Sequence, residues 1–165
     1  MTGETAHFPS EISVANAGHA RIVAQLQIDF GAEFGEPEPP VAVLEPRFRK
    51  MIESPAAFVL LIGDPESPDG PDGYAVVTLR PSVYTDGDLA VLDELYVVPR
   101  LRGRGIGSQL IDRVIAQVLE RGGGELHINV DEVDTDARRF YVRHGFANGE
   151  RGFGRELLYS RDLEN

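Results

Sequence analysis

One segment, residues 92–118, constrains the fold more than any other part of the chain, because a strand, a glycine-rich turn and a helix follow one another within it. Its first seven residues (LDELYVV) are rich in β-branched and aromatic side chains and precede Pro99, which predicts a strand that ends there. Apolar side chains recur at helical spacing from Ile106 to Val118, which predicts a helix. Between the two lie three glycines, Gly103, Gly105 and Gly107.

The turn and the start of this helix predict a binding site for an anion. Backbone N–H groups point outward at a helix N-terminus, the helix dipole favours negative charge, and glycine lets a phosphate approach the main chain closely. Arg102 and Arg104 add positive charge beside the glycines. We therefore expect a ligand that carries phosphate.

Three nucleotide-binding signatures do not fit the spacing. A dinucleotide fingerprint that starts at Gly103 or Gly105 requires a glycine where Ser108 or Leu110 stands. A P-loop requires a lysine at its end, and the turn has none. A Rossmann unit would open the chain, whereas this turn lies about two thirds along it.

The remaining periodicity and turn signals predict a mixed sheet. In chain order we expect a strand at 11–14, helices at 19–34 and 43–53, strands at 57–62, 73–81 and 89–98, a helix at 106–121, a strand at 126–130, a helix at 134–144 and a strand at 155–160. The strand after the glycine-rich turn is expected to run parallel to the one before it, because a helix crosses between them. The fold class is therefore α/β (of the α+β type), with a largely antiparallel central sheet of about six or seven strands and helices on both faces.

Composition limits the class of protein. The 165 residues fit one domain, 1–165, and 42% hydrophobic residues suffice for one core. The chain has no cysteine, so it has neither a disulfide nor a thiolate nucleophile. A formal net charge of -11 argues against a nucleic-acid partner and is compatible with a cationic substrate. Residues 1–10 do not resemble a signal peptide and no apolar run is long enough to span a membrane, so we expect a cytoplasmic protein without a membrane partner.

At the glycine-rich turn the sequence resembles a known family. Residues 102–107 (RGRGIG) match the Arg/Gln-x-x-Gly-x-Gly/Ala signature of the GNAT superfamily of N-acetyltransferases. About thirty residues later, 137–146 (ARRFYVRHGF) resemble the Ala-x-x-x-Tyr-x-x-x-Gly-Phe helix of that family. The resemblance covers nearly the whole chain and implies the acyl-CoA N-acyltransferase fold, with a sheet whose parallel pair splays apart. Within the superfamily, the polyamine and aminoglycoside acetyltransferases are the most similar.

The resemblance implies that acetyl-CoA is the co-substrate. The turn would bind its pyrophosphate, and the pantetheine arm would pair with the strand before the turn, where one N–H faces the thioester carbonyl. The residues expected to contact the cofactor are Leu95, Tyr96, Val97, Val98, Arg102, Gly103, Arg104, Gly105, Ile106, Gly107, Ser108, Asp134 and Tyr141. The family often has asparagine where Asp134 stands, and a carboxylate cannot donate the hydrogen bond that an amide does.

Three residues are candidates for proton transfer. Asp93 and Glu94 are adjacent on the strand, so alternation places them on opposite faces of the sheet, and either could be the general base. A buried carboxyl has a raised pKa, which suits a base that works near neutral pH. Tyr141 is the candidate general acid for the departing thiolate. His127 is an alternative base, although a histidine that only makes local contacts is the simpler interpretation. The four histidines lack the spacing of a metal site.

The predicted function is acetyl transfer to a primary amine by direct attack in a ternary complex. The acceptor is expected to be a cationic small molecule of the polyamine or aminoglycoside type. Two alternatives remain open: a non-catalytic acyl-CoA-binding or sensor domain, and a protein or peptide N-acetyltransferase. The sequence is compatible with a homodimer but contains no signal for one.

Overall fold

In the computed structural model, which describes residues 11–148 and 158–163, five strands form one sheet in the order β1-β2-β3-β4-β5. They are β1 (Ile12–Val14), β2 (Ala57–Ile62), β3 (Gly73–Arg80), β4 (Asp88–Val97) and β5 (Gly123–Ile128). The first three pairs are antiparallel, and β4 and β5 form the one parallel pair. The mixed sheet is confirmed, but the expected number of six or seven strands is wrong. Of the strand expected at 155–160, residues 155–157 lie outside the described residues and 158–160 are not a strand.

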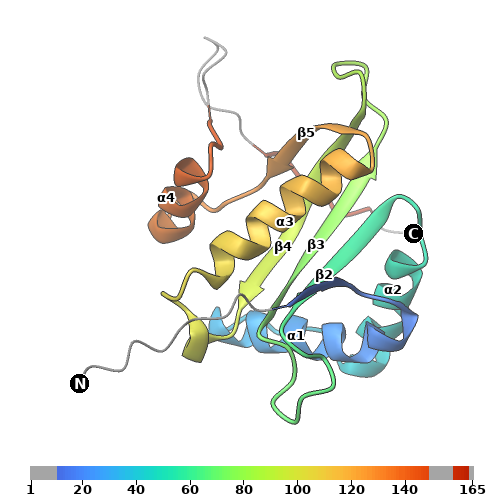
Figure 1. The fold of residues 1–165 in the computed structure, drawn as a ribbon, viewed down its shortest axis with the longest axis vertical. Coiled ribbons are helices and arrows are strands. Elements are labelled where there is room, and N and C mark those ends of the chain that lie inside the picture. The colour runs from blue at the N-terminus through green and yellow to red at the C-terminus, as the bar shows by residue number, and fades with distance from the viewer. Residues whose placement is uncertain (1–10, 149–157, 164–165) are drawn as a thin grey trace. The chain divides into compact units, whose positions relative to one another are not determined.

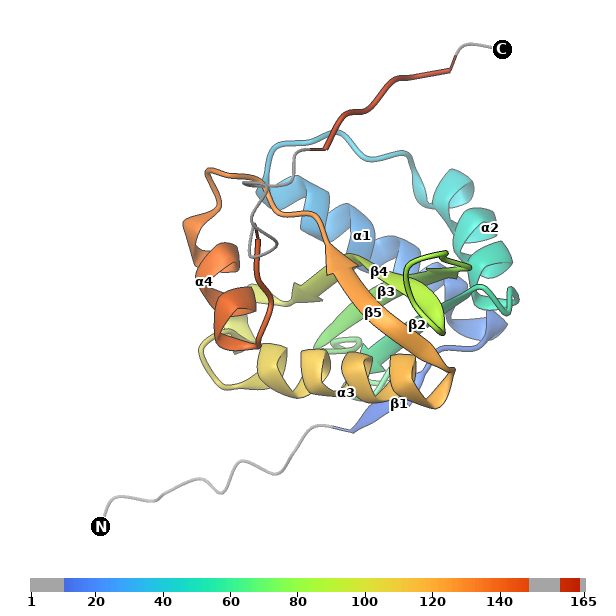
Figure 2. The same ribbon diagram turned by 90° about the horizontal axis from the view of Figure 1, so that it is seen from above.

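Helices cover both faces of the sheet, as expected (Figure 2). The described helices are α1 (Ala20–Glu33), α2 (Val41–Ile52), α3 (Ile106–Glu120) and α4 (Thr135–Arg143), with short 3₁₀ turns at Ala17–His19 and Pro99–Leu101. Figures 1 and 2 show α1 and α2 together on one face and α3 on the other. No helix among the described residues is long and apolar enough to cross a membrane.

The chain divides into two compact parts. The first part runs to His127 and contains the sheet with α1, α2 and α3. The second part begins at Ile128 and contains α4. That residues 1–165 act as a single domain stays a prediction.

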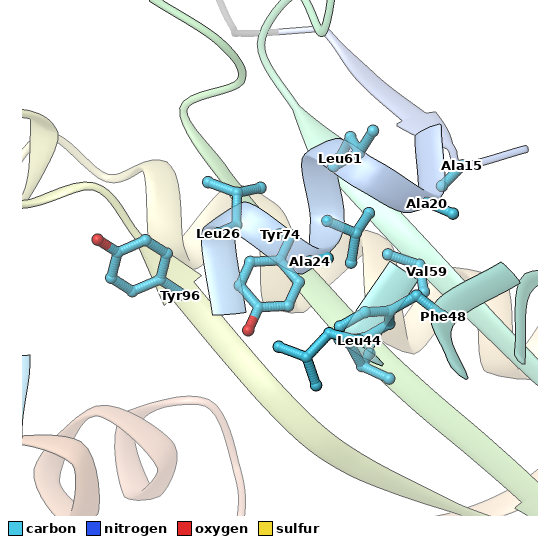
Figure 3. Packing of buried hydrophobic residues seen from close by; sticks show 12 residues of the cluster. Ala15, Ala20, Ala24, Leu26, Leu44, Phe48, Val59, Leu61, Tyr74 and Tyr96 are labelled. Carbon is cyan, nitrogen blue, oxygen red and sulfur yellow. The ribbon is translucent and has the colours of Figure 1, made fainter. Parts of the chain in front are cut away.

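A cluster of buried apolar side chains joins α1 and α2 to their face of the sheet (Figure 3). The sheet contributes alternate residues of its strands, as expected for one face of a pleated surface. The cluster consists of Ala15, Ala20, Val23, Ala24, Leu26, Leu44, Phe48, Val59, Leu61, Tyr74, Val76 and Tyr96. The side chains that alternate with these on β2 and β3 are also buried, so both faces of the central strands are covered.

Strand β4 contains a β-bulge in the middle of its pairing with β3. Val77 lies opposite Leu92, but its neighbour Val76 lies opposite Glu94, so Asp93 is an extra residue on β4. Since Val76 and Val77 point to opposite faces of β3, their partners Leu92 and Glu94 also lie on opposite faces, although they are two residues apart. The bulge therefore shifts the alternation of β4, and Glu94 and Tyr96 share the face that packs against α1 and α2.

Glycines allow β5 to begin beside β4 earlier than expected. The run Gly122–Gly124 was expected to end the helix as a loop, but β5 already starts at Gly123, which is buried. A Cβ atom at Gly87 would collide with the carbonyl oxygen of Gly122 and would lie 3.1 Å from the N atom of Gly124. The chain thus comes close to itself just before the parallel strands begin, and a side chain at Gly87 would not fit there.

We expect Gly87→Ala to lower the free energy of unfolding by about 2 kcal/mol, because its methyl group must displace main-chain atoms rather than a flexible side chain. Urea unfolding followed by circular dichroism measures the change. The control is Val83→Ala in the same β3–β4 connection, where 92% of the side chain is exposed and the expected change is within about 0.5 kcal/mol. Equal stabilities for the two variants would contradict the close approach.

Candidate active site

The glycine-rich loop, residues 102–108, has the open geometry of an anion site. Gly103 and Gly105 have φ of 73° and 78°, in the left-handed region that favours glycine. A Cβ atom at either position would meet nothing within 4 Å, so the main chain is accessible there. The first bond of α3 runs from the N–H of Gln109 to the carbonyl of Gly105 at 3.0 Å. The N–H groups of the preceding turn therefore have no acceptor within the helix, and they fit a phosphate group.

The two arginines of the loop differ in their contacts. Arg102 donates from Nε to the carbonyl of Val97 at 2.8 Å and from Nη2 to both carboxylate oxygens of Glu33, at 2.9 and 2.8 Å. Its guanidinium also lies 5.5 Å from the ring centroid of Tyr96. Arg102 thus links Glu33, the last residue of α1, to Val97, the last residue of β4, through hydrogen bonds. Arg104 is exposed and has no ion pair among the described residues, so its charge is available to an anion.

The ring of Tyr96 is part of this contact between α1 and β4. It is 4% exposed and packs against Phe30, with 5.1 Å between the ring centroids. Burial, followed by a hydrogen bond to the Glu33 carboxylate, raises the pKa of Tyr96 to about 12. The phenol is therefore neutral at physiological pH.

Both candidate bases lie on the same face of the sheet, which corrects the expectation of opposite faces. Thr78 and Val76 share one face of β3, since they are two residues apart. The hydroxyl of Thr78 donates to Oδ2 of Asp93 at 2.8 Å, and Val76 is the partner of Glu94. The physical reason is the bulge, because the extra residue interrupts the alternation on which the prediction depended.

The two carboxyls have different surroundings. Asp93 is exposed, and partial burial of its carboxyl raises its pKa while the hydrogen bond from Thr78 lowers it. Glu94 is less exposed. Burial is the main cause that raises its pKa from 4.5 to about 7, and the negative charges of Glu38, Asp93 and Glu36 add to it, while a hydrogen bond from Gln27 opposes it. Glu94 is thus the carboxyl better suited to accept a proton near neutral pH.

In the second part of the chain, Asp134 directly precedes α4 and Tyr141 lies on it. The carboxylate of Asp134 accepts a hydrogen bond from the N–H of Ala137 at 2.9 Å, so it caps the helix. Tyr141 is 8% exposed, and its ring makes edge contacts with Phe140 and Phe146, at 5.2 and 5.4 Å between centroids. The cofactor contacts of Asp134 and Tyr141 stay predictions.

His127 makes a local contact. Its Nε2 lies 2.6 Å from Oε1 of Glu125, two residues earlier on β5, and its side chain is exposed. This matches the simpler interpretation given for it above. Among the described residues, no group of three histidine or acidic side chains could hold a metal ion.

Three contacts were not predicted from the sequence: those of Gln27 and Glu38 beside Glu94, and that of Glu33 with Arg102. Gln27 lies between Val23 and Gly31 on a stripe of α1 whose spacing is four residues, and both of these neighbours are buried. A polar side chain on an otherwise buried stripe was the signal that could have identified it. Glu33 and Glu38 contact partners far away in the sequence or in another element, and no local pattern indicates them.

A model of the acetyltransferase (GNAT) family matches residues 23–146, which are most of the chain and include every site residue described above. The chain belongs to the acetyltransferase (GNAT) family. A crystal structure from Arthrobacter sp. FB24, of a protein assigned as an acetyltransferase, is 41% identical, covers 97% of this chain and 99% of that one, and superposes with a TM-score of 0.84. The GNAT fold is therefore confirmed.

Relatives with named activities are more distant. A thialysine N-epsilon-acetyltransferase of Bos taurus is 30% identical over 87 residues, which cover 52% of this chain and 51% of that protein. An uncharacterized N-acetyltransferase of Archaeoglobus fulgidus is 31% identical over 43% of this chain and 48% of its own length. The matches thus span about half the length of these two relatives. An aminoglycoside acetyltransferase from an uncultured soil metagenomic sample shares the fold, with a TM-score of 0.72 at 18% identity, over 94% of this chain and 96% of its own.

The raised pKa of Glu94 predicts a stability effect that depends on pH. Because the pKa is higher in the folded state, protonation of Glu94 stabilises the fold below about pH 4.5, and this contribution is lost as the pH rises through about 7. Glu94→Gln removes the charge, so its stability relative to the natural protein should increase between pH 5 and pH 8 by about 1–2 kcal/mol. Denaturant unfolding at both pH values measures this.

The control for this experiment is Glu66→Gln, which makes the same change of charge at an exposed position in the β2–β3 loop. Its effect should stay within about 0.5 kcal/mol at both pH values. A Glu94→Gln difference that is the same at pH 5 and pH 8 would show that the carboxyl is not perturbed by folding.

Proposed function

We propose that the protein is an N-acetyltransferase that transfers the acetyl group of acetyl-CoA to a cationic primary amine by direct attack in a ternary complex. The observation that carries this is on β4. The strand holds the half-buried carboxyl of Glu94, with a pKa of about 7, and leads within a few residues into the open glycine-rich loop. A base for an ammonium group and a binding site for a phosphate-bearing donor are thus joined in one continuous segment.

Acetyl-CoA would bind along this segment. The N–H groups of the glycine-rich loop would hold its pyrophosphate, with Arg104 supplying an unpaired positive charge. The main chain of Leu95, Tyr96, Val97 and Val98 would pair with the pantetheine arm, and one N–H would donate to the thioester oxygen as negative charge develops there. Such a donor typically contributes about 3–4 kcal/mol to the stability of the transition state.

The reaction requires two proton transfers on the chain's own groups. The acceptor ammonium gives one proton to a carboxylate, for which Glu94 is the better candidate and Asp93 the alternative, and the free amine attacks the thioester carbon. As the C–N bond forms and the C–S bond breaks, the phenol of Tyr141 gives its proton to the departing thiolate. The second proton on nitrogen then passes through solvent and restores the phenol, and the carboxyl releases its proton to solvent, so each turnover releases one proton.

The charge around Glu94 supports a cationic acceptor. Glu36, Glu38 and Asp93 all raise its pKa electrostatically, so the region has a negative potential that attracts an ammonium group. The thialysine acetyltransferase among the relatives is named for an amine on a side chain, and the aminoglycoside enzyme among the structural neighbours is named for a polycationic acceptor. A small-molecule amine with more than one positive charge is the acceptor that these observations favour.

Titration calorimetry with acetyl-CoA should give a single binding site, and thiol release should then appear with at least one acceptor from a panel of polyamines, aminoglycosides, lysine analogues and peptides. Arg104→Gln should weaken binding of acetyl-CoA about three- to tenfold, since one charge-assisted contact is lost. Binding without thiol release for any acceptor would support a sensor domain instead. Failure to bind CoA would exclude both.

Tyr141→Phe should lower kcat about 10²-fold or more, because the thiolate would lose its proton donor, while affinity for acetyl-CoA changes less than threefold. Stopped-flow single-turnover measurements separate the chemical step from product release. The control is Tyr159→Phe, an exposed tyrosine at 87% in the C-terminal segment. An unchanged rate constant for the chemical step would remove Tyr141 from this role.

A further inference from the structure

The amide of Gln27 connects two acidic side chains and a buried phenol. Its Oε1 accepts a hydrogen bond from the hydroxyl of Tyr74 at 2.7 Å, and its Nε2 donates to Oε1 of Glu38 at 3.0 Å. Glu94 is the partner of Val76 and Tyr96 that of Tyr74, so the Glu94 carboxyl lies on the same face of the sheet as Tyr74. Gln27 lowers the pKa of Glu94 by hydrogen bonding, against the effect of burial and of the neighbouring acids. The amide NH₂ group has two hydrogens, of which one is directed to Glu38.

Tyr74 fixes the orientation of this amide. Its side chain is fully buried, and burial together with the charges of Glu94 and Glu38 raises its pKa far above the usual value, so the phenol remains a donor. If the amide were turned over, its carbonyl would face the two carboxylates and its NH₂ group would face the phenol. The observed orientation is the one in which the NH₂ group can donate to ionised carboxylates.

Glu38 is held in place from two further sides. It lies between Pro37 and Pro39, which restrict its backbone to extended conformations. Its side chain packs against Gly31, where a Cβ atom would collide with Cγ and would lie 2.7 Å from Oε1 of Glu38. Glycine inside a helix costs about 1 kcal/mol relative to alanine. The space it leaves on α1 is the space that Glu38 fills.

We propose that Gln27 is a positioning residue for acetyl transfer, which orients the carboxylate of Glu94 and holds that of Glu38 beside it. This inference rests on the proposed function, in which Glu94 takes the proton of the acceptor. The groups that face Glu94 are Gln27 on α1, Glu36 and Glu38 in the α1–α2 loop, Tyr74 on β3 and Asp93 on β4. Three of these groups are acids and none is a cation. Glu38 raises the pKa of Glu94 because it carries a like charge, whereas Gln27 lowers it by hydrogen bonding.

Opposite shifts of the pH profile test the proposal. Glu38→Gln removes a like charge, so the acidic limb of kcat/KM should move about 0.5–1 pH unit lower, and the relative activity at pH 6 should rise about three- to fivefold. Gln27→Met removes the donor to the ionised carboxylate, so the limb should move higher and kcat at the plateau should fall about tenfold. A residue needed only for folding would not shift the limb in either direction.

Gly31→Ala provides a variant that keeps every polar group of the network. Its methyl group occupies the position of the Glu38 side chain, which is flexible and can move aside, so the protein should remain folded. Because Glu38 is then displaced from Glu94, the acidic limb should shift in the same direction as in Glu38→Gln. An unmoved limb in both variants would overturn the role of Glu38.

The matched controls are Gln25→Met and Glu66→Gln. Gln25 lies on the exposed side of α1 and donates to Asp29 at 2.9 Å, so it repeats the glutamine–carboxylate pair away from Glu94. Glu66→Gln makes the same change of net charge as Glu38→Gln at an exposed position. Both should leave the profile within about 0.2 pH units of the natural protein, since screening weakens distant charges. A shift in these controls equal to that in Gln27→Met or Glu38→Gln would also overturn the proposal.

A titration of the glutamate carboxyls by carbon-13 NMR separates failure of this inference from failure of the proposed function. The Glu94 signal is assigned by its loss in Glu94→Gln, and its midpoint should fall in Glu38→Gln and rise in Gln27→Met. Normal turnover with an unmoved Glu94 midpoint would overturn the positioning role alone. Absence of thiol release from the natural protein with every acceptor would overturn the proposed function and with it a role for Gln27 in catalysis.

Discussion

The extra residue on β4 determines which side chains face α1 and α2. Without the bulge at Asp93, strict alternation would place Leu92 and Glu94 on one face, and either the leucine would leave the core or the glutamate would enter it. With the bulge, Leu92 remains fully buried on the face opposite α1 and α2, while Glu94 and Tyr96 face the two helices. The bulge thus allows β4 to place Leu92 in the core on one face and Glu94 among other acidic side chains on the opposite face.

The sequence predicted the elements well, because their signals are local. Hydrophobic periodicity located α1, α3 and the strands β1 to β4. Strand β5 was placed too late, because a run of glycines normally indicates a loop. Here Gly122 has a φ of 80°, in the left-handed region, and a Cβ atom at Gly123 would collide with the Val118 side chain, so glycines occur although a strand begins.

The candidate site was predicted less completely, because its contacts join distant segments. The carboxyl of Glu94 was identified from its strand, but its pKa depends on Glu38, and their common partner Gln27 lies on another helix. Arg102 was predicted to serve the anion, yet it is paired with Glu33, sixty-nine residues earlier. A bulge also leaves no mark on a pattern of single residues, so the shared face of Asp93 and Glu94 could not be inferred.

The ion pair between Arg102 and Glu33 has a consequence for the variability of this fold. Arg102 is the first residue of the glycine-rich loop, and it forms an ion pair with Glu33, the last residue of α1. The helix therefore ends beside the start of this loop. Substitutions in the middle of α1, for example at Gln27, can change the surroundings of Glu94 while the ion pair between Arg102 and Glu33 remains. A lengthened or shortened α1 would instead move Glu33 along the helix axis by about 1.5 Å and around it by about 100° per residue. A point substitution in α1 therefore leaves this ion pair in place, whereas an insertion or deletion displaces Glu33 from Arg102.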